Sequence, residues 1–135
     1  MTLVIGFVLA LLVVQTLSPP FFRYAFNPAP QATLRNAAGP RDVAPPHTLL
    51  SARLDRARLN LHESLFLFVP LSLLLILQER ETGTAMAGAW LFVAMRVLYV
   101  PVYALGARYI RPLVFIASVF GLAQMASQVR WHSPF

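Results

Sequence analysis

The chain has 135 residues, of which 58% are apolar and only 12% charged, and its mean hydropathy is +0.64. Soluble domains carry about 25% charged residues, so this composition excludes an ordinary soluble domain and indicates lipid as the main solvent. The absence of cysteine excludes disulfides and a thiol nucleophile supplied by the chain. The net charge of +6 comes from arginines beside apolar segments, which fits membrane orientation and does not indicate nucleic-acid binding.

The first apolar segment, residues 2–22, is free of charge over 21 residues, a length that spans one bilayer core as a helix. A signal peptide would need a basic start and a small-residue cleavage site, and neither precedes Pro19 and Pro20, so we expect the segment to be retained. The two prolines are expected to end or bend this helix. Residues 23–48 are rich in proline and predict an exposed loop.

Three further helices are predicted, at residues 50–78, 84–106 and 111–129, joined by short turns. Thr48 or Ser51 can cap the first of them, and Pro112 is expected at the first position of the last, where proline is favoured. The predicted fold class is therefore all-α: an integral membrane four-helix bundle that forms a single transmembrane domain over residues 1–135.

The arginines are distributed unevenly between the two sides of this bundle. The loop and the foot of the second long helix carry six, the turn near residues 106–111 carries two, and the opposite side has only Arg80 and Arg130. The positive-inside rule then predicts a multi-pass protein whose loop 23–48 is cytoplasmic and whose two termini are outside.

Polar residues concentrate on the second and third long helices. At 100° per residue, four polar residues of the second helix fall within an arc of about 80°: Arg53, Arg56, Asn60 and Glu63. On the third helix, Arg96, Tyr99 and Tyr103 share a face. Glu63 and Arg96 are the only charges deep in apolar runs, and an isolated charge there costs several kcal/mol. We therefore expect these two side chains to form an ion pair.

The opposite side of the second long helix is also polar, with Asp55, Arg58 and His62. A membrane-surface helix with two polar faces must meet two polar environments, or one partner and water. The three histidines stand singly and no HExxH motif is present, so no metal site is predicted. Ala117 and Gly121, four residues apart on the last helix, predict close helix packing.

The order of several motifs resembles one membrane family. Residues 56–63 have the form R-A-x-L-N-x-x-E, and Arg96-x-x-Tyr99-x-x-x-Tyr103 follows with an arginine turn at residues 108–111. This arrangement resembles the MAPEG family, the membrane-associated proteins in eicosanoid and glutathione metabolism. The first motif is similar to that of microsomal glutathione transferases, and the second to that of the leukotriene-forming branch. The segment Gly39-Pro40-Arg41-Asp42 is similar to bacterial members.

The resemblance implies a bacterial inner-membrane protein that assembles as a homotrimer and binds glutathione between subunits near the cytoplasmic face. By the same resemblance, Arg111 is the catalytic residue that stabilises the thiolate, because Arg108 does not fit the family spacing. The implied ligand-binding residues are Arg56, Asn60, Glu63, Arg96, Tyr99 and Tyr103.

Two classes of function follow from these observations. One is a glutathione-dependent transferase or peroxidase that acts on lipophilic electrophiles, which the intact Arg56, Asn60 and Glu63 favour. The other is a non-catalytic membrane protein that binds lipid or serves as an accessory subunit of a larger membrane complex. Pro112 favours this second class, because some family members carry a polar side chain near the thiol at that position.

Overall fold

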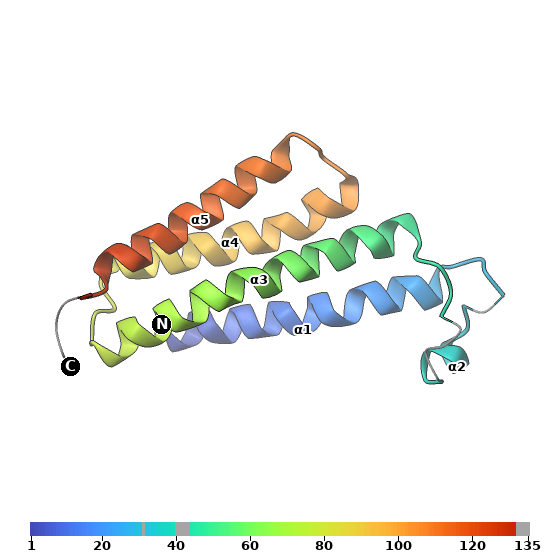
Figure 1. The fold of residues 1–135 in the computed structure, drawn as a ribbon, viewed down its shortest axis with the longest axis horizontal. Helices are drawn as coiled ribbons and strands as arrows, with labels where there is room; N and C mark the ends of the chain where they lie inside the picture. The colour runs from blue at the N-terminus through green and yellow to red at the C-terminus, as the bar shows by residue number, and fades with distance from the viewer. Residues whose placement is uncertain (31, 40–43, 132–135) are drawn as a thin grey trace.

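The computed structural model describes residues 1–30, 32–39 and 44–131 (Figure 1). Pro40, Arg41 and Asp42 of the bacterial-type motif therefore lie outside the described residues. Within these ranges every regular element is helical, and the elements are α1 (Thr2–Ala25), α2 (Leu34–Ala37), α3 (Leu49–Leu77), α4 (Gly83–Leu105) and α5 (Ile110–Gln128). The four long helices are each apolar and long enough to cross a membrane, as the sequence predicts.

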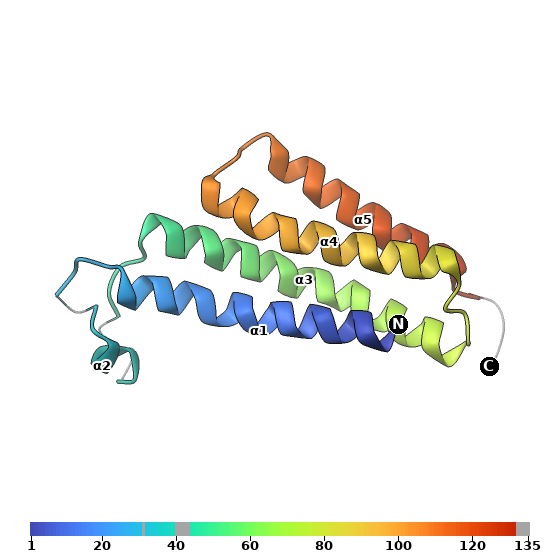
Figure 2. The same cartoon turned by 180° about the vertical axis from the view of Figure 1, so that it is seen from behind.

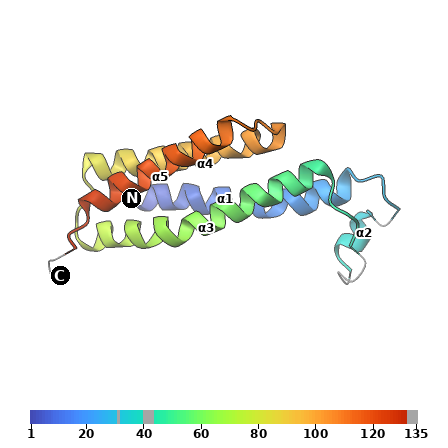
Figure 3. The same cartoon turned by 45° about the horizontal axis from the view of Figure 1, so that its top comes forward.

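The four long helices lie roughly along one direction, with α1 beside α3 and α4 beside α5 (Figures 1 and 2). Met1 and the end of α5 lie at the same end of the bundle as the α3–α4 turn, and we call this the terminus end. The Met1 ammonium bonds to the carboxylate of Glu81 there. The other end carries α2, the start of α3 and the α4–α5 turn, and we call it the loop end (Figure 3).

The prediction that Pro19 and Pro20 end or bend the first helix is wrong about its end, because α1 continues through both to Ala25. Pro19 cannot donate a hydrogen bond to the carbonyl of Gln15. The Ser18 hydroxyl donates to that carbonyl instead, at 3.4 Å. Local side chains of this kind compensate for proline inside membrane helices.

Thr48, the first of the two predicted capping residues, caps the start of α3. The Thr48 hydroxyl accepts a hydrogen bond from the backbone N–H of Ser51 at 3.1 Å. The predicted start of the last helix is slightly wrong, because α5 begins at Ile110 and places Pro112 in its first turn. Proline is still compatible with this position, since the first N–H groups of a helix have no intrahelical partner.

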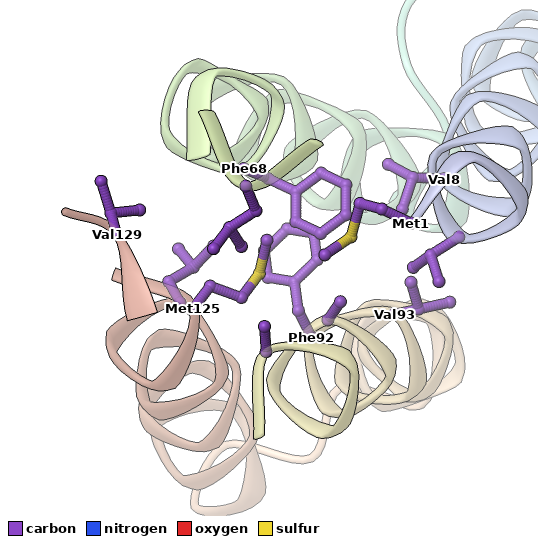
Figure 4. Close-up of a cluster of buried hydrophobic side chains, with 12 residues drawn as sticks. Met1, Val8, Phe68, Phe92, Val93, Met125 and Val129 are labelled. Carbon is purple, nitrogen blue, oxygen red and sulfur yellow. The ribbon is translucent and has the colours of Figure 1, made fainter. Parts of the chain in front are cut away.

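The main apolar core lies toward the terminus end and receives side chains from all four long helices (Figure 4). Its centre is a stack of Phe68 and Phe92, whose ring centroids are 4.6 Å apart with an interplanar angle of 10°. Phe7 contacts Trp90 edge-on at the same end, with centroids 5.5 Å apart. This packing holds the α1–α3 and α4–α5 pairs together in one unit.

The α4–α5 pair crosses where two glycines meet. Gly88 and Gly121 are both buried, and a Cβ atom on Gly88 would lie 2.6 Å from the backbone oxygen of Gly121. Small residues allow such close approach of backbones in membranes, where dispersion contacts between helices replace the hydrophobic effect. The predicted small-residue packing of α5 is therefore confirmed at Gly121, with Gly88 as its partner.

Candidate functional site

A buried guanidinium lies between α3 and α4, nearer the loop end than the main core. Arg96 is only 2% exposed, and its Nη1 donates a hydrogen bond to the Oδ1 atom of Asn60. Its Nε has no hydrogen-bond partner among the described residues. An arginine in this position holds a full charge in an apolar bundle with one neutral acceptor.

The expected Glu63–Arg96 ion pair is wrong for the single subunit. The described residues contain two ion pairs, Met1–Glu81 and Asp55–Arg58, and neither includes Glu63 or Arg96. Glu63 is exposed on the outer side of α3, whereas Asn60 faces α4. Three residues of helix separate their directions by about 60°, and this difference points Asn60 inward and Glu63 outward.

Aromatic rings surround the Arg96 guanidinium in place of a carboxylate. Its central carbon lies 5.2 Å from the ring centroid of Phe92, 5.5 Å from that of Tyr99 and 5.6 Å from that of Phe115. Cation–π contacts of this type each contribute up to about 2 kcal/mol when desolvated. They stabilise the charge in place but do not neutralise it, so the site still favours an anion.

A second arginine closes the row of aromatic residues toward the loop end. The ring centroids of Tyr99 and Tyr103 are 4.8 Å apart, and the guanidinium of Arg111 lies 4.4 Å from the centroid of Tyr103. The Nε of Arg111 also has no partner among the described residues. Arg108 is exposed and makes no described ring contact, so the geometry groups Arg111 with the tyrosines.

Sequence reasoning placed Arg53 in the polar arc but gave it no role. Its Nη1 donates to the carbonyl of Ala104 at 3.0 Å, which ties the foot of α3 to the last turn of α4. Gly106 ends α4 with a φ of 77°, and a Cβ there would lie 2.7 Å from the Arg53 Nη2. The glycine that follows Leu105 indicates the end of α4, since left-handed caps favour glycine, but it does not indicate the contact with Arg53.

The predicted polar arc is therefore divided between two directions. Arg53 and Asn60 face α4, whereas Arg56 and Glu63 lie on an exposed strip of α3. We call this strip the α3 outer face, and it consists of Arg56, Leu59, Glu63, Phe66, Leu67 and Pro70. Its first half carries the two charges and its second half is apolar, a combination that suits neither lipid nor water alone.

The other polar side of α3 faces away from this strip. The Arg58 guanidinium donates to Asp55 Oδ1 from Nε at 2.9 Å and from Nη2 at 2.8 Å. This ion pair lies next to the end of α1. The expectation of two separate polar environments for α3 agrees with this arrangement.

These features define a class of protein: a multi-pass membrane bundle of four helices with a partly buried cluster of arginine, asparagine and tyrosine between α3, α4 and α5. The family model of the MAPEG family matches residues 1–131. The chain therefore belongs to the MAPEG family, as its motifs indicate. No curated protein and no solved structure matches it.

Proposed function

We propose that this protein is a glutathione-dependent transferase or peroxidase of the inner membrane that acts on lipophilic electrophiles as a homotrimer. The observation that carries the proposal is the Arg96 guanidinium, which is buried without an anionic partner among the described residues. An uncompensated charge at this depth costs several kcal/mol. A bound anion would remove that cost, because arginine forms bidentate, charge-assisted hydrogen bonds with carboxylates.

The charges available around the site match those of glutathione, which has two carboxylates and one ammonium group. Arg96 and Arg56 are suited to the carboxylates, and Glu63 can accept hydrogen bonds from the ammonium. In a single subunit Arg56 and Glu63 lie on the α3 outer face, away from Arg96. A neighbouring copy packed on this face would enclose a ligand held by Arg56 and Glu63, so assembly is part of the proposal.

Arg111 would act on the sulfur atom of the bound thiol. A guanidinium favours the thiolate, which is the nucleophilic form, and Tyr103 holds the Arg111 side chain through a ring contact. The electrophile would arrive from the bilayer, because large apolar side chains on the first turns of α5 are exposed, including Leu113 and Ile116. The arginine-rich loop end would then face the cytoplasm, where glutathione is available.

A titration of glutathione into the purified protein tests this proposal. We expect saturable heat release and thermal stabilisation, both lost in Arg56→Ala and Glu63→Ala. Arg130→Ala is the matched control, because Arg130 is also exposed but lies at the terminus end. A folded protein that gives no response at several millimolar glutathione would overturn the proposal.

A second candidate is an accessory role without catalysis, in which the protein binds lipid or braces a larger membrane complex. It is favoured by the exposed, non-polar Pro112 beside Arg111. Turnover with a chromogenic electrophile separates the two. The accessory role would be favoured if the protein binds glutathione without turnover and if Arg111→Ala binds glutathione with the same affinity.

A further inference from the structure

A cavity of about 500 Å³ lies at the loop end, on the side of α3 that carries Asp55 and Arg58. The last three turns of α1 form one wall, and the other walls come from Ala37 of α2, from Ala44 and His47 before α3, and from Asp55 and Arg58 of α3. Its lining residues on α1 are Thr16, Pro19, Pro20, Phe21, Arg23 and Tyr24. This cavity is separate from the cluster around Arg96, which lies between α3, α4 and α5.

Arg23 is the first charged residue after the apolar run of α1, so it lies where hydrocarbon gives way to headgroups. Its Nε donates to the carbonyl of Pro45 at 2.6 Å, which fixes the side chain. Neither Nη atom has a hydrogen bond within the described part of the chain. The two Nη atoms therefore offer a preorganised fork for an oxyanion.

The opposite wall offers a carboxylate oxygen. Both hydrogen bonds from Arg58 end on Oδ1 of Asp55, and the Oδ2 atom has no described partner. The Asp55 side chain is 32% exposed in the structure, so this oxygen remains accessible. The cavity thus combines a free guanidinium edge with a free carboxylate oxygen, a pattern that suits a ligand with both an anionic and a cationic group.

The rim of the cavity continues into apolar surface. Leu17 and Phe21 on α1 are 63% and 53% exposed, and both lie within the membrane-spanning helix. A soluble anion would make no use of this surface. A ligand that carries acyl chains would cover it while its headgroup remains at the level of Arg23.

We propose that this cavity binds the headgroup of a bilayer phospholipid that carries a phosphate and a primary ammonium, as in phosphatidylethanolamine. The Arg23 fork holds the phosphate, Asp55 Oδ2 accepts from the ammonium, and the acyl chains lie along Leu17 and Phe21. Phosphatidylglycerol shares the phosphate but lacks the ammonium, so Asp55 gives the site its preference. The inference does not depend on glutathione binding, since none of these residues belongs to that site.

Lipid binding to delipidated protein in detergent, followed by native mass spectrometry and thermal unfolding, tests the site. We expect phosphatidylethanolamine to bind and stabilise the wild type more than phosphatidylglycerol. Arg23→Gln should weaken both lipids about tenfold, the loss expected for one charge-assisted contact. Asp55→Asn should weaken phosphatidylethanolamine alone and leave phosphatidylglycerol unchanged or tighter, because Arg58 is then released. Arg108→Gln, an exposed arginine at the same end, is the matched control and should change neither.

Two results would overturn the proposal. One is equal retention of phosphatidylethanolamine by the wild type and by folded Arg23→Gln or Asp55→Asn protein. The other is equal stabilisation by soluble glycerophosphoethanolamine, which would show that the site binds a free phosphoester and makes no use of the acyl chains. If Arg23→Gln fails to fold, the ratio of phosphatidylethanolamine binding to phosphatidylglycerol binding in Asp55→Asn, compared with the wild type, decides alone. None of these assays contains glutathione, so their outcome is separate from that of the proposed function.

Discussion

The glycine contact between α4 and α5 gives the most direct quantitative prediction. In Gly88→Ala the new Cβ would lie 2.6 Å from the Gly121 oxygen and 2.9 Å from the Gln124 Cβ. Ordinary contact begins near 3.4 Å, so α4 and α5 must move apart by about 0.8 Å at this point. The Gly121 oxygen is a backbone atom and cannot rotate away, so the two helices must shift as units.

The expected size of the effect follows from two opposing contributions. Overpacking of a tight contact costs about 1–3 kcal/mol, and replacing glycine by alanine inside a helix contributes about 0.5–1 kcal/mol in the other direction. We expect a net loss of about 1–2 kcal/mol in the free energy of unfolding for Gly88→Ala. Gly6→Ala is the matched control, because Gly6 lies inside α1 and a new Cβ would have no atom within 4 Å apart from its chain neighbours and its own helix backbone. This variant should be as stable as the wild type or more stable.

Equilibrium unfolding in mixed micelles, followed by circular dichroism, measures both variants under the same conditions. The double variant Gly88→Ala/Gly121→Ala should lose less than the two single losses added together, because one separation of the helices accommodates both methyl groups. If Gly88→Ala proves as stable as Gly6→Ala, the close approach of α4 and α5 is not a constraint and this account of their packing is wrong.

Three further predictions concern the site and the orientation. A double-mutant cycle of Asn60→Leu and Arg96→Leu should give a coupling free energy of about 1–3 kcal/mol. The cycle of Glu63→Ala and Arg96→Leu should give no coupling in the monomeric protein. The reverse result would mean that Arg96 pairs with Glu63 and not with Asn60. Gly106→Ala should lower the free energy of unfolding by about 1–2 kcal/mol through its positive φ. The loss should be smaller in an Arg53→Ala background, where the new Cβ meets no guanidinium. Equal losses in the two backgrounds would exclude a clash with Arg53. Reporter fusions should place residue 40 in the cytoplasm and residue 79 outside, and a periplasmic residue 40 would contradict the arginine argument.

The sequence predicted the membrane helices well because each depends on a local property. The absence of charge over residues 2–22 and the arginine-bearing turn at residues 108–111 are visible without tertiary structure, and α1 and α5 follow from them. The extension of α1 to Ala25 was not predictable from the prolines alone. The Ser18 hydroxyl donates to the carbonyl of Gln15, one of the acceptors that the prolines leave without an N–H donor.

The site was harder to predict, because helical periodicity gives relative directions on one helix but not its rotation against a neighbour. The arc from Arg53 to Glu63 was correct, yet a rotation of α3 by a few tens of degrees decides which of its members face α4. Asn60 therefore meets Arg96, and Glu63 does not. The cavity beside Arg23 could not be predicted from the sequence for a similar reason, since it requires the end of α1 to lie against Asp55 and Arg58.

The aromatic residues that absorb and emit light are separated along the bundle. Trp90, in contact with Phe7, and Trp131 lie toward the terminus end, whereas Tyr24, Tyr99, Tyr103 and Tyr109 all lie toward the loop end. Excitation at wavelengths that only tryptophan absorbs therefore observes the half of the bundle near the terminus end. Tyrosine difference absorbance observes the other. The unmodified protein thus contains two independent optical probes, one for each end, and a ligand that enters beside Tyr103 should change the tyrosine signal while the tryptophan signal stays constant.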